Sequence, residues 1–307
     1  MPDTIRYLPR AVINIETWDR CISHAPNGLI YAYSFYLDNM ARHWDALVWG
    51  DYECVMPITW NKKLGISYLY QPPFTASLGI FGNKITDSLI MEFIRSIPSR
   101  YKLVEIDMNF GNKLSLPNQD IHLRENYILD LNNPYEKIYT GYRDNIKRNC
   151  KKAQQLNCRY SNMVPVDEVI RLSQEQMGKQ SAASPEDYRR FKNLFHFLQA
   201  RGQATACGIY MDSGELMASC VFFFSHNRAY YILVGNHPNG KTIGASHFLI
   251  DRFISEHAGK NLLLDFEGSD IRNLAFFYSS FGAVAESYPA LHINRLPWWV
   301  RIIKNVK

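Results

Sequence analysis

The two halves of the chain show the same order of apolar and polar positions. Residues 45–60 and 205–224 each read as two strands of alternating pattern joined by a tight turn. In both halves a third strand, a loop containing glycine, an amphipathic helix and a further strand follow. The helices are expected over residues 88–98 and 246–257, and the last strands over residues 102–112 and 261–267.

This repeated order predicts an internal duplication with a period of about 150 residues, which is too long for a solenoid. The boundary is expected near residues 132–137, where Pro134 follows a strand, so that the domains cover residues 1–134 and 135–307. Hairpins followed by strand–helix–strand crossovers build a mixed sheet with helices on its faces. We therefore predict an α/β fold (α+β mixed sheet) in two tandem domains.

Composition narrows the class of protein. The 307 residues suit two domains, and 47% hydrophobic with 21% charged residues is typical of a soluble globular protein. The formal net charge of +5 is too small for a dedicated nucleic-acid binder, although it does not exclude a local basic patch. Six cysteines without a C-x-x-C pair favour reduced thiols and no metal site. With no apolar segment of 18 residues, a cytoplasmic protein is expected.

The loop before the second helix, Gly235 to Ser246, has the features of an anion site. Backbone N–H groups at a helix N-terminus lack partners, and the helix dipole is positive there. Gly240 and Gly244 allow close backbone approach to a ligand, and Lys241 adds a positive charge. A plain connection that needs glycine only for its turn is equally compatible with this spacing.

The order of elements resembles the GNAT acyltransferase fold, whose loop of pattern Arg/Gln-x-x-Gly-x-Gly/Ala holds the pyrophosphate of acyl-CoA. Gly244 matches the central glycine, whereas Lys241 and Ser246 depart from the pattern. Tyr278 followed by Gly282 matches a later segment whose tyrosine often protonates the departing CoA thiolate. The resemblance implies a binding site for acyl-CoA, with acetyl-CoA expected, at Lys241, Thr242, Ile243, Gly244, Ala245 and Ser246. It also implies that a backbone N–H of Val234, Gly235 or Asn236 polarises the thioester carbonyl.

The duplication makes the chain similar to one branch, the Fem-type (FemAB-like) peptidyltransferases. Those enzymes take their donor from aminoacyl-tRNA and act on lipid-linked cell-wall precursors. The segment between Pro165 and Arg201 is too short for the long helical arm that Fem proteins often carry.

Asp265 and Glu267 end the second-half strand, where alternation places both on one face. Ligands of α/β sheets usually lie at the carboxyl ends of strands. We therefore predict Glu267 as the base that accepts a proton from an attacking amine, Asp265 as its orienting partner and Tyr278 as the acid. The alternatives are structural: Glu267 binding the backbone of the turn, Asp265 pairing with a cation, Ser269 or Asp270 capping the next helix, and Tyr278 packing among phenylalanines.

The matching strand of the first half carries Glu105 and Asp107 on one face, but the loop before it has no basic residue. We interpret the first half as a degenerate copy that shapes the acceptor site. The candidate lining residues are Tyr68, Tyr70, Gln71 and Phe74. Ordinary packing between domains explains these residues equally well.

A basic helix is expected over residues 139–157. Its apolar stripe contains Tyr142, Ile146, Cys150 and Ala153, and its basic residues are Arg143, Lys147, Arg148, Lys151 and Lys152. Such a surface suits a phosphate-rich partner, including tRNA, a nucleotide or a lipid diphosphate, although a solvated helix face has the same pattern.

The C-terminal segment mixes Trp298, Trp299, Ile302 and Ile303 with Arg301, Lys304 and Lys307. This composition is compatible with peripheral contact to an anionic inner-membrane surface, or with tryptophans packed on the preceding domain.

Three functions remain. The first is an N-acyltransferase that uses acyl-CoA and a small or cell-envelope amine. The second is an aminoacyl-tRNA-dependent transferase of the Fem type, and the third is a binding protein whose sites have decayed.

Overall fold

The computed structural model describes residues 4–115, 119–178, 183–268, 270–297 and 300. The chain forms two compact units: residues Met1–Arg124 with Ser287–Lys307, and residues Glu125–Glu286. The boundary between the units thus lies about ten residues before the one expected at residue 134. The last segment, Ser287–Lys307, belongs to the first unit. The chain passes between the units in the two long strands β7 (Ile121–Asp130) and β13 (Val284–Asn294).

The first unit has a mixed sheet of order β1-β2-β3-β4-β6-β13. All neighbours are antiparallel except β4 and β6, which are parallel. The strands are β1 (Ile5–Leu8), β2 (His43–Trp49), β3 (Cys54–Lys63), β4 (Ile66–Leu69) and β6 (Tyr101–Asp107), and the short β5 (Phe81–Gly82) pairs with β3. The helices are η1 (Arg10–Val12), α1 (Ile15–His24), η2 (Ile30–Ala32), α2 (Ser34–Met40) and α3 (Asp87–Ser96).

The second unit repeats the order hairpin, third strand, helix and parallel strand. Its sheet order is β7-β12-β11-β10-β9-β8, with β11 and β12 parallel. The strands are β8 (Arg159–Ser161), β9 (Ala204–Tyr210), β10 (Leu216–Ser225), β11 (Arg228–Asn236) and β12 (Leu263–Asp265). The helices are α4 (Tyr135–Thr140), α5 (Asp144–Gln155), α6 (Val166–Met177), α7 (Pro185–Gln199), α8 (Gly240–Ile243), α9 (Ala245–His257) and α10 (Arg272–Ser279). The predicted mixed α/β architecture is confirmed.

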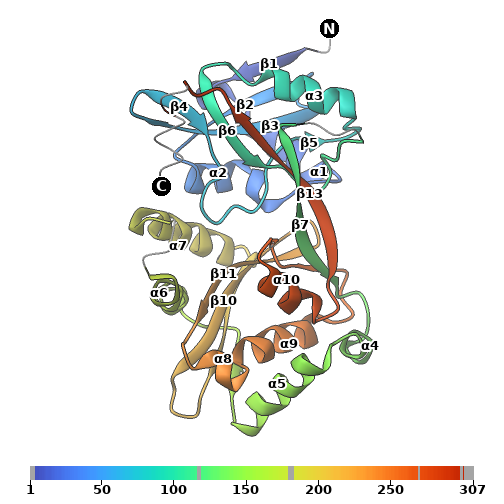
Figure 1. Cartoon of the computed structure of the whole chain (residues 1–307), viewed down its shortest axis with the longest axis vertical. Helices are drawn as coiled ribbons and strands as arrows, with labels where there is room; N and C mark the ends of the chain where they lie inside the picture. The colour runs from blue at the N-terminus through green and yellow to red at the C-terminus, as the bar shows by residue number, and fades with distance from the viewer. Residues whose placement is uncertain (1–3, 116–118, 179–182, 269, 298–299, 301–307) are drawn as a thin grey trace. The chain divides into compact units, whose positions relative to one another are not determined.

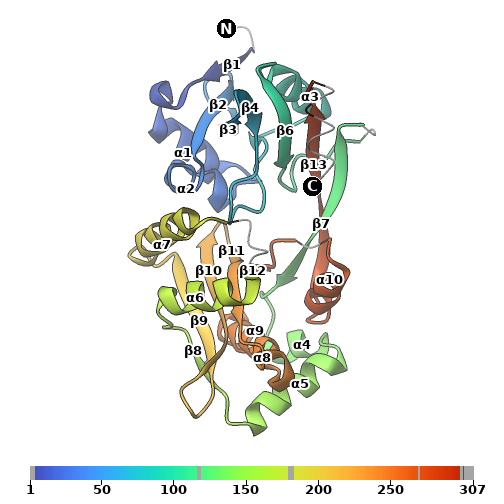
Figure 2. The ribbon, with the colours of Figure 1, turned by 60° about the vertical axis from the view of Figure 1, so that its left-hand side comes forward.

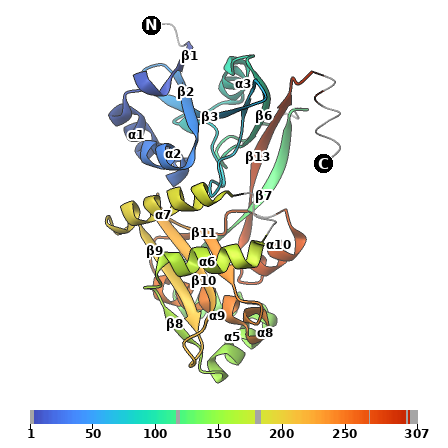
Figure 3. The same cartoon turned by 90° about the vertical axis from the view of Figure 1, so that its left-hand side faces the viewer.

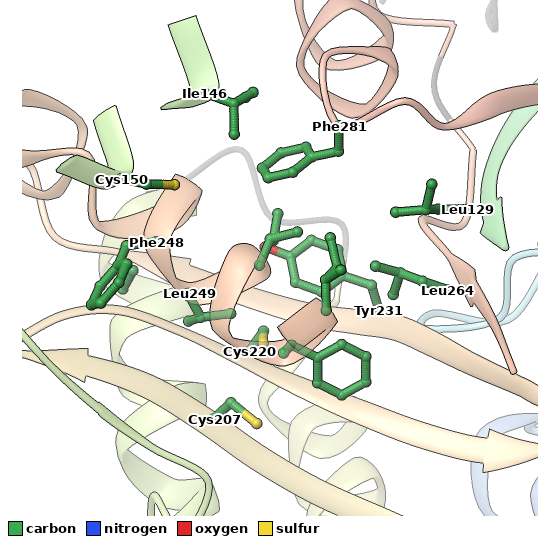
Figure 4. Packing of buried hydrophobic residues seen from close by; sticks show 14 of the residues in the cluster. Leu129, Ile146, Cys150, Cys207, Cys220, Tyr231, Phe248, Leu249, Leu264 and Phe281 are labelled. Atoms are coloured by element: carbon green, nitrogen blue, oxygen red, sulfur yellow. The ribbon is translucent and has the colours of Figure 1, made fainter. Parts of the chain in front are cut away.

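Helices cover both faces of the second sheet, and alternation along β10 explains this. Phe222 stacks on Phe253 of α9, with ring centroids 3.7 Å apart, whereas Phe223 stacks on Phe191 of α7 at 5.4 Å. Figures 2 and 3 show α6 and α7 on one side of the strands and α9 on the other. The core on the α9 side also contains Leu249, Leu264 and Phe281 (Figure 4). A strand with two apolar faces is typical of a sheet buried on both sides.

The expected single helix over residues 139–157 is in fact two helices, α4 and α5. The break falls at Gly141, whose N–H bonds the carbonyl of Ile138 as α4 ends. Arg143 is extended at the N-cap of α5. The predicted apolar stripe is correct, since Tyr142, Ile146, Cys150 and Ala153 are all buried. The periodicity was therefore informative, although the turn within it was missed.

Among the described residues, none of the helices has both the length and the apolar character needed to cross a bilayer.

Candidate functional site

The strands β11 and β12 separate at the point where the site was expected. They pair only over Arg228–Tyr230 and Leu263–Asp265, and β12 then ends while β11 continues to Asn236. A register shift between β10 and β11 leaves Ile232 of β11 without a partner on β10, which is a β-bulge. Beyond Tyr230, one edge of β11 is therefore not covered by β12.

Backbone N–H groups of β11 face this uncovered edge. The N–H of His237 bonds the carbonyl of Met217 on β10, whereas the N–H of Asn236 bonds Gln176 Oε1 of α6 at 2.7 Å. Because directions alternate along an antiparallel strand, the N–H of Val234 points to the same side as that of Asn236. Val234 is thus placed as the backbone donor at the open edge.

Gly235 has a different role from its two neighbours. A Cβ built on it would lie 2.6 Å from the backbone nitrogen of Ser173 and 2.9 Å from the carbonyl carbon of Leu172. Real Cβ atoms essentially never come this close, so glycine is needed here for α6 to pack against β11. The predicted contact of Gly235 with a ligand has no support in this packing.

The glycine turn before α9 is also shaped by neighbouring elements. Gly244 has φ +78°, and its Cβ would lie 2.6 Å from the carbonyl oxygen of Asn149 on α5. The Cβ of Gly240 would lie 2.3 Å from the carbonyl oxygen of Met217. Both glycines are therefore required by packing, which was the alternative explanation of the loop.

The first turn of α9 nevertheless keeps the features of an anion site. The N-cap Gly244 provides no side-chain cap, and no acidic residue lies in the first turn. Ser246 Oγ donates to Asn236 Oδ1 at 2.5 Å, which ties the turn to the end of β11. Lys241 and Thr242 are exposed, Ile243 is half-buried and Ala245 is buried.

Helix α5 brings its basic residues to this turn, a proximity that the sequence analysis did not foresee. Asn149 contacts Gly244, and Lys152, three residues further along α5, lies on the same side of the helix. Arg143, Arg148, Lys151 and Lys152 are exposed, whereas Lys147 is half-buried with its Nζ 5.3 Å from the ring centroid of Tyr139. The basic helix and the glycine turn are thus parts of one surface.

Asp265 is the centre of a buried hydrogen-bond network. Its side chain accepts from Arg228 Nη1 at 2.8 Å, from Asn126 Nδ2 at 2.8 Å and from the backbone N–H of Glu267 at 2.9 Å. The Arg228 guanidinium also binds both carboxylate oxygens of Glu286. Burial opposes the charge of Arg228, but Glu286 and Asp265 outweigh it and raise the pKa of that guanidinium. Pairing with a cation, one of the structural alternatives, is therefore present.

Glu267 does not continue the strand. The strand β12 ends at Asp265, and Glu267 has φ +62°, a left-handed conformation that is uncommon for a residue with a Cβ. The expectation that the two carboxylates alternate on one strand face was wrong. Instead, Asp265 holds the backbone N–H of Glu267, and such local strain is often found at functional sites.

Tyr278 lies close to Glu267. Its ring is buried and stacks on Phe266 with centroids 4.5 Å apart, and it meets Tyr231 of β11 at 6.5 Å. Burial, and after it the charge of Glu267, raises the pKa of Tyr278 well above its ordinary value. A tyrosine that stays protonated beside a carboxylate at a strand opening has the arrangement of an acid–base pair.

Two residues that the sequence analysis missed complete the site. Gln176 binds the end of β11, and nothing in its local pattern distinguishes it from other polar residues of α6. His247, in the first turn of α9, contacts Phe277 edge-to-face at 4.9 Å, and its buried Nδ1 has no hydrogen-bond partner among the residues that the structure describes. Burial lowers the pKa of His247 to about 4, so its imidazole is neutral near pH 7.

The first unit has a cavity of about 600 Å³ beside the carboxyl ends of its parallel strands β4 and β6. Tyr70 and Gln71 line it, together with Glu105 and Asp107. Phe74 does not line this cavity; its carbonyl accepts a hydrogen bond from the hydroxyl of Tyr36. The further charged or ionisable residues of the lining are His122, Arg124 and His292.

Two earlier predictions lie outside the described residues: the tail from Trp298 onward, apart from Val300, and the capping role of Ser269. Within the described part of the chain, no three His, Cys, Asp or Glu side chains could together hold a metal ion.

Comparison with known proteins identifies similar folds. The family model described as Acetyltransferase (GNAT) domain matches residues 140–268, most of the second unit. The crystal structure of FemX is similar with a TM-score of 0.64 at 11% identity, covering 92% of this chain and 96% of FemX. A protein of unknown function from Bacteroides thetaiotaomicron VPI-5482 gives a TM-score of 0.60 at 12% identity, covering 91% and 97%.

A third similar structure is the C-terminal domain (DUF2156) of a putative lysylphosphatidylglycerol synthetase from Agrobacterium fabrum. It gives a TM-score of 0.53 at 10% identity, covering 95% of this chain and 94% of that one. No curated protein matched the sequence. At these identities, the solved structures show a shared fold.

Proposed function

Because residues 140–268 match the family model described as Acetyltransferase (GNAT) domain and the chain has a fold similar to that of FemX, we propose that the protein transfers an acyl group from acyl-CoA to an amine by direct attack. The observation that carries this proposal is the opening between β11 and β12. There the N–H of Val234 faces an uncovered edge, and Glu267 lies within electrostatic reach of Tyr278.

The proposed reaction has no covalent enzyme intermediate. The amine attacks the thioester carbonyl, a C–N bond forms, and Glu267 accepts the amine proton. The N–H of Val234 stabilises the oxyanion of the tetrahedral intermediate. As the C–S bond breaks, Tyr278 gives its proton to the leaving thiolate, and the protonated Glu267 then returns a proton to the Tyr278 phenolate. Asp265 acts as a positioning residue, because it fixes the backbone of Glu267.

We assign the CoA phosphates to the uncapped first turn of α9. Backbone N–H groups at a helix N-terminus and nearby basic side chains favour a phosphate. Lys241 replaces the Arg or Gln of the GNAT pattern, and Lys152 of α5, on the side of the helix that contacts Gly244, adds a second cation.

The amine acceptor is assigned to the cavity of the first unit. Glu105 lies there with His292 Nδ1 at 3.6 Å, and the Asp107 carboxylate is bound by Arg124 at 2.7 Å. Because Arg124 offsets Asp107, the Glu105 charge makes this lining negative when the histidines are neutral, which suits an ammonium group. The acyl group and the acceptor class, small amine or lipid-linked precursor, are left to experiment.

Aminoacyl-tRNA is the second candidate donor. The pyrophosphate of CoA would occupy only the first turn of α9. The exposed basic residues of α5 extend beyond that turn, and the longer phosphate backbone of tRNA would bind them. If the acceptor is a lipid-linked precursor, we propose that the C-terminal segment from Trp298 onward contacts the membrane surface.

Calorimetric titration with acetyl-CoA and CoA tests the donor. We expect Kd values of about 10 µM or below for the wild type. Lys241→Gln and Lys152→Gln should each weaken CoA binding about three- to tenfold, because each removes one of the two cations proposed to bind the phosphates. Lys102→Gln, an exposed residue of β6, is the matched control and should bind as the wild type does.

Absence of CoA binding would overturn the acyl-CoA proposal. A tRNA complex that weakens with salt and with the same two substitutions would then support the second donor. A protein that binds neither would be the decayed binding protein of the third hypothesis.

A further inference from the structure

A second cavity lies in the second unit, at the opposite end of α9 from the glycine turn. It has a volume of about 490 Å³, and residues at the C-terminal end of α9 and at the start of β9 line it. Helix α9 has 13 residues, so its two ends are about 20 Å apart. This volume is typical of small-molecule sites, and the cavity is separate from the glycine turn at the other end of the helix.

Aromatic rings form the walls of this cavity. Tyr160, Phe224 and His257 line it and are half-buried. The His257 ring stacks on Phe253, at 4.2 Å and 20°, and lies near Phe224, at 6.0 Å and 21°, while Phe224 and Phe253 are 6.3 Å apart. Packing therefore fixes two of the wall rings before any ligand binds.

The imidazole of His257 is an uncharged part of the wall. Its Nδ1 lies 2.9 Å from the carbonyl oxygen of Phe253, which can only accept, so Nδ1 carries the proton. Burial lowers the pKa of His257, and the ring is therefore neutral near pH 7. The Nε2 atom is then an acceptor.

The rim carries one charge of each sign. Glu256 is exposed, and its Oε2 accepts a hydrogen bond from the Tyr160 hydroxyl at 3.0 Å. Lys260 is also exposed, and in the described part of the chain it makes no ion pair within 4.0 Å. The two charges therefore do not neutralise each other by direct contact, although both line the same cavity.

We propose that this cavity binds a free aromatic α-amino acid as its zwitterion. The side-chain ring packs against Tyr160, Phe224 and His257. The ammonium group binds Glu256, and the carboxylate binds Lys260. A zwitterion with a ring can pair with both rim charges and fill the aromatic cavity. A simple anion, a simple cation or a neutral ring would leave Glu256, Lys260 or both without a partner.

A ligand series tests each part of this recognition with the full chain. L-Phenylalanine is the probe, and binding is followed by saturation-transfer NMR and calorimetry. N-Acetyl-L-phenylalanine lacks the ammonium, L-phenylalaninamide lacks the carboxylate, and L-alanine lacks the ring. We expect each charge deletion to weaken binding about three- to tenfold and L-alanine not to bind at millimolar concentration.

Two substitutions should remove the charge preferences separately. Glu256→Gln should weaken L-phenylalanine about three- to tenfold while leaving N-acetyl-L-phenylalanine unchanged. Lys260→Gln should also weaken the binding of L-phenylalanine about three- to tenfold, while leaving the binding of L-phenylalaninamide unchanged. Glu136→Gln, which removes an exposed carboxylate of α4, is the matched control and should change none of these affinities.

The proposal is overturned if N-acetyl-L-phenylalanine and L-phenylalaninamide each bind as tightly as L-phenylalanine. It is also overturned if L-phenylalanine shows no binding at concentrations up to about 10 mM. It is also overturned if Glu256→Gln and Glu136→Gln have equal effects. Binding of acetyl-CoA should be the same in all three variants, so failure of this inference leaves the acyl-transfer proposal untouched.

Discussion

Tyr278 illustrates how a single side chain links packing to chemistry. Its ring belongs to the core through Phe266 and Tyr231, while Glu267 lies within electrostatic reach of its hydroxyl. Burial disfavours the phenolate, and the carboxylate disfavours it further, so the proton is retained at neutral pH. The raised pKa also makes the phenol a weaker acid, so its proton moves to the sulfur as the C–S bond breaks, after Glu267 has been neutralised by the amine proton.

Tyr278→Phe should therefore lower kcat with acetyl-CoA by about 10²- to 10⁴-fold and leave the KM for the donor nearly unchanged. An aryl thioester has a better leaving group and needs less protonation, so its loss should be much smaller. Steady-state kinetics with both donors provide the measurement. Tyr127→Phe, whose ring lies 6.4 Å from Tyr278, is the control. Equal losses with both donors would mean that Tyr278 acts only through packing.

The carboxylates show what residue patterns could and could not predict. The acid-rich end of an apolar strand identified Asp265 and Glu267 from the sequence. The partner of Asp265 is Arg228, which lies 37 residues earlier on another strand, and Glu286 follows on a third. Such pairing depends on which strands become neighbours, and a local pattern does not contain that information.

At the scale of elements, the glycines show which contacts a local sequence pattern does not predict. The spacing left a ligand loop and a plain connection equally open, and the structure adds that the backbones of β10 and α5 leave no room for a Cβ at Gly240 and Gly244. The helices expected over residues 88–98 and 246–257 correspond to α3 and α9, because periodicity is a local property. The contact between α5 and the glycine turn could not be predicted from a local pattern, because Gly244 and Asn149 are about 95 residues apart in the chain.

Gly235 provides the corresponding prediction. Gly235→Ala places a Cβ 2.6 Å from the Ser173 nitrogen, so α6 must move away from β11. We expect a loss of about 1–3 kcal/mol in the free energy of unfolding, measured by urea denaturation. Because Gln176 of the same helix binds the end of β11, weaker donor binding should accompany the loss.

Gly141→Ala is the control for this change. Gly141 has φ −72°, and its nearest neighbour would be the Ile138 oxygen at 3.2 Å, so a cost below about 1 kcal/mol is expected. An equal cost at both positions would contradict the argued crowding between α6 and β11.

At the scale of the whole molecule, the division into units differs most from the sequence prediction. The duplicated order of elements was recognisable, but the boundary at residue 134 assigned the C-terminal segment to the second half. The structure pairs Ala290–Asn294 of β13 with Leu103–Asp107 of β6 in the first unit. An alternating strand pattern states that a strand forms, and it does not state which sheet the strand joins.

This assignment can be tested with one core residue of β13. Leu291 is buried and pairs with Ile106, so Leu291→Ala should cost about 2–5 kcal/mol of stability. Amide hydrogen exchange should accelerate in β6 and in its neighbour β4, and much less in β9, β10 and β11. Leu249→Ala, an equally buried change on α9, should produce the opposite distribution. If Leu291→Ala instead accelerated exchange mainly in β10 and β11, the C-terminal strand would belong with the second unit, as the sequence had indicated.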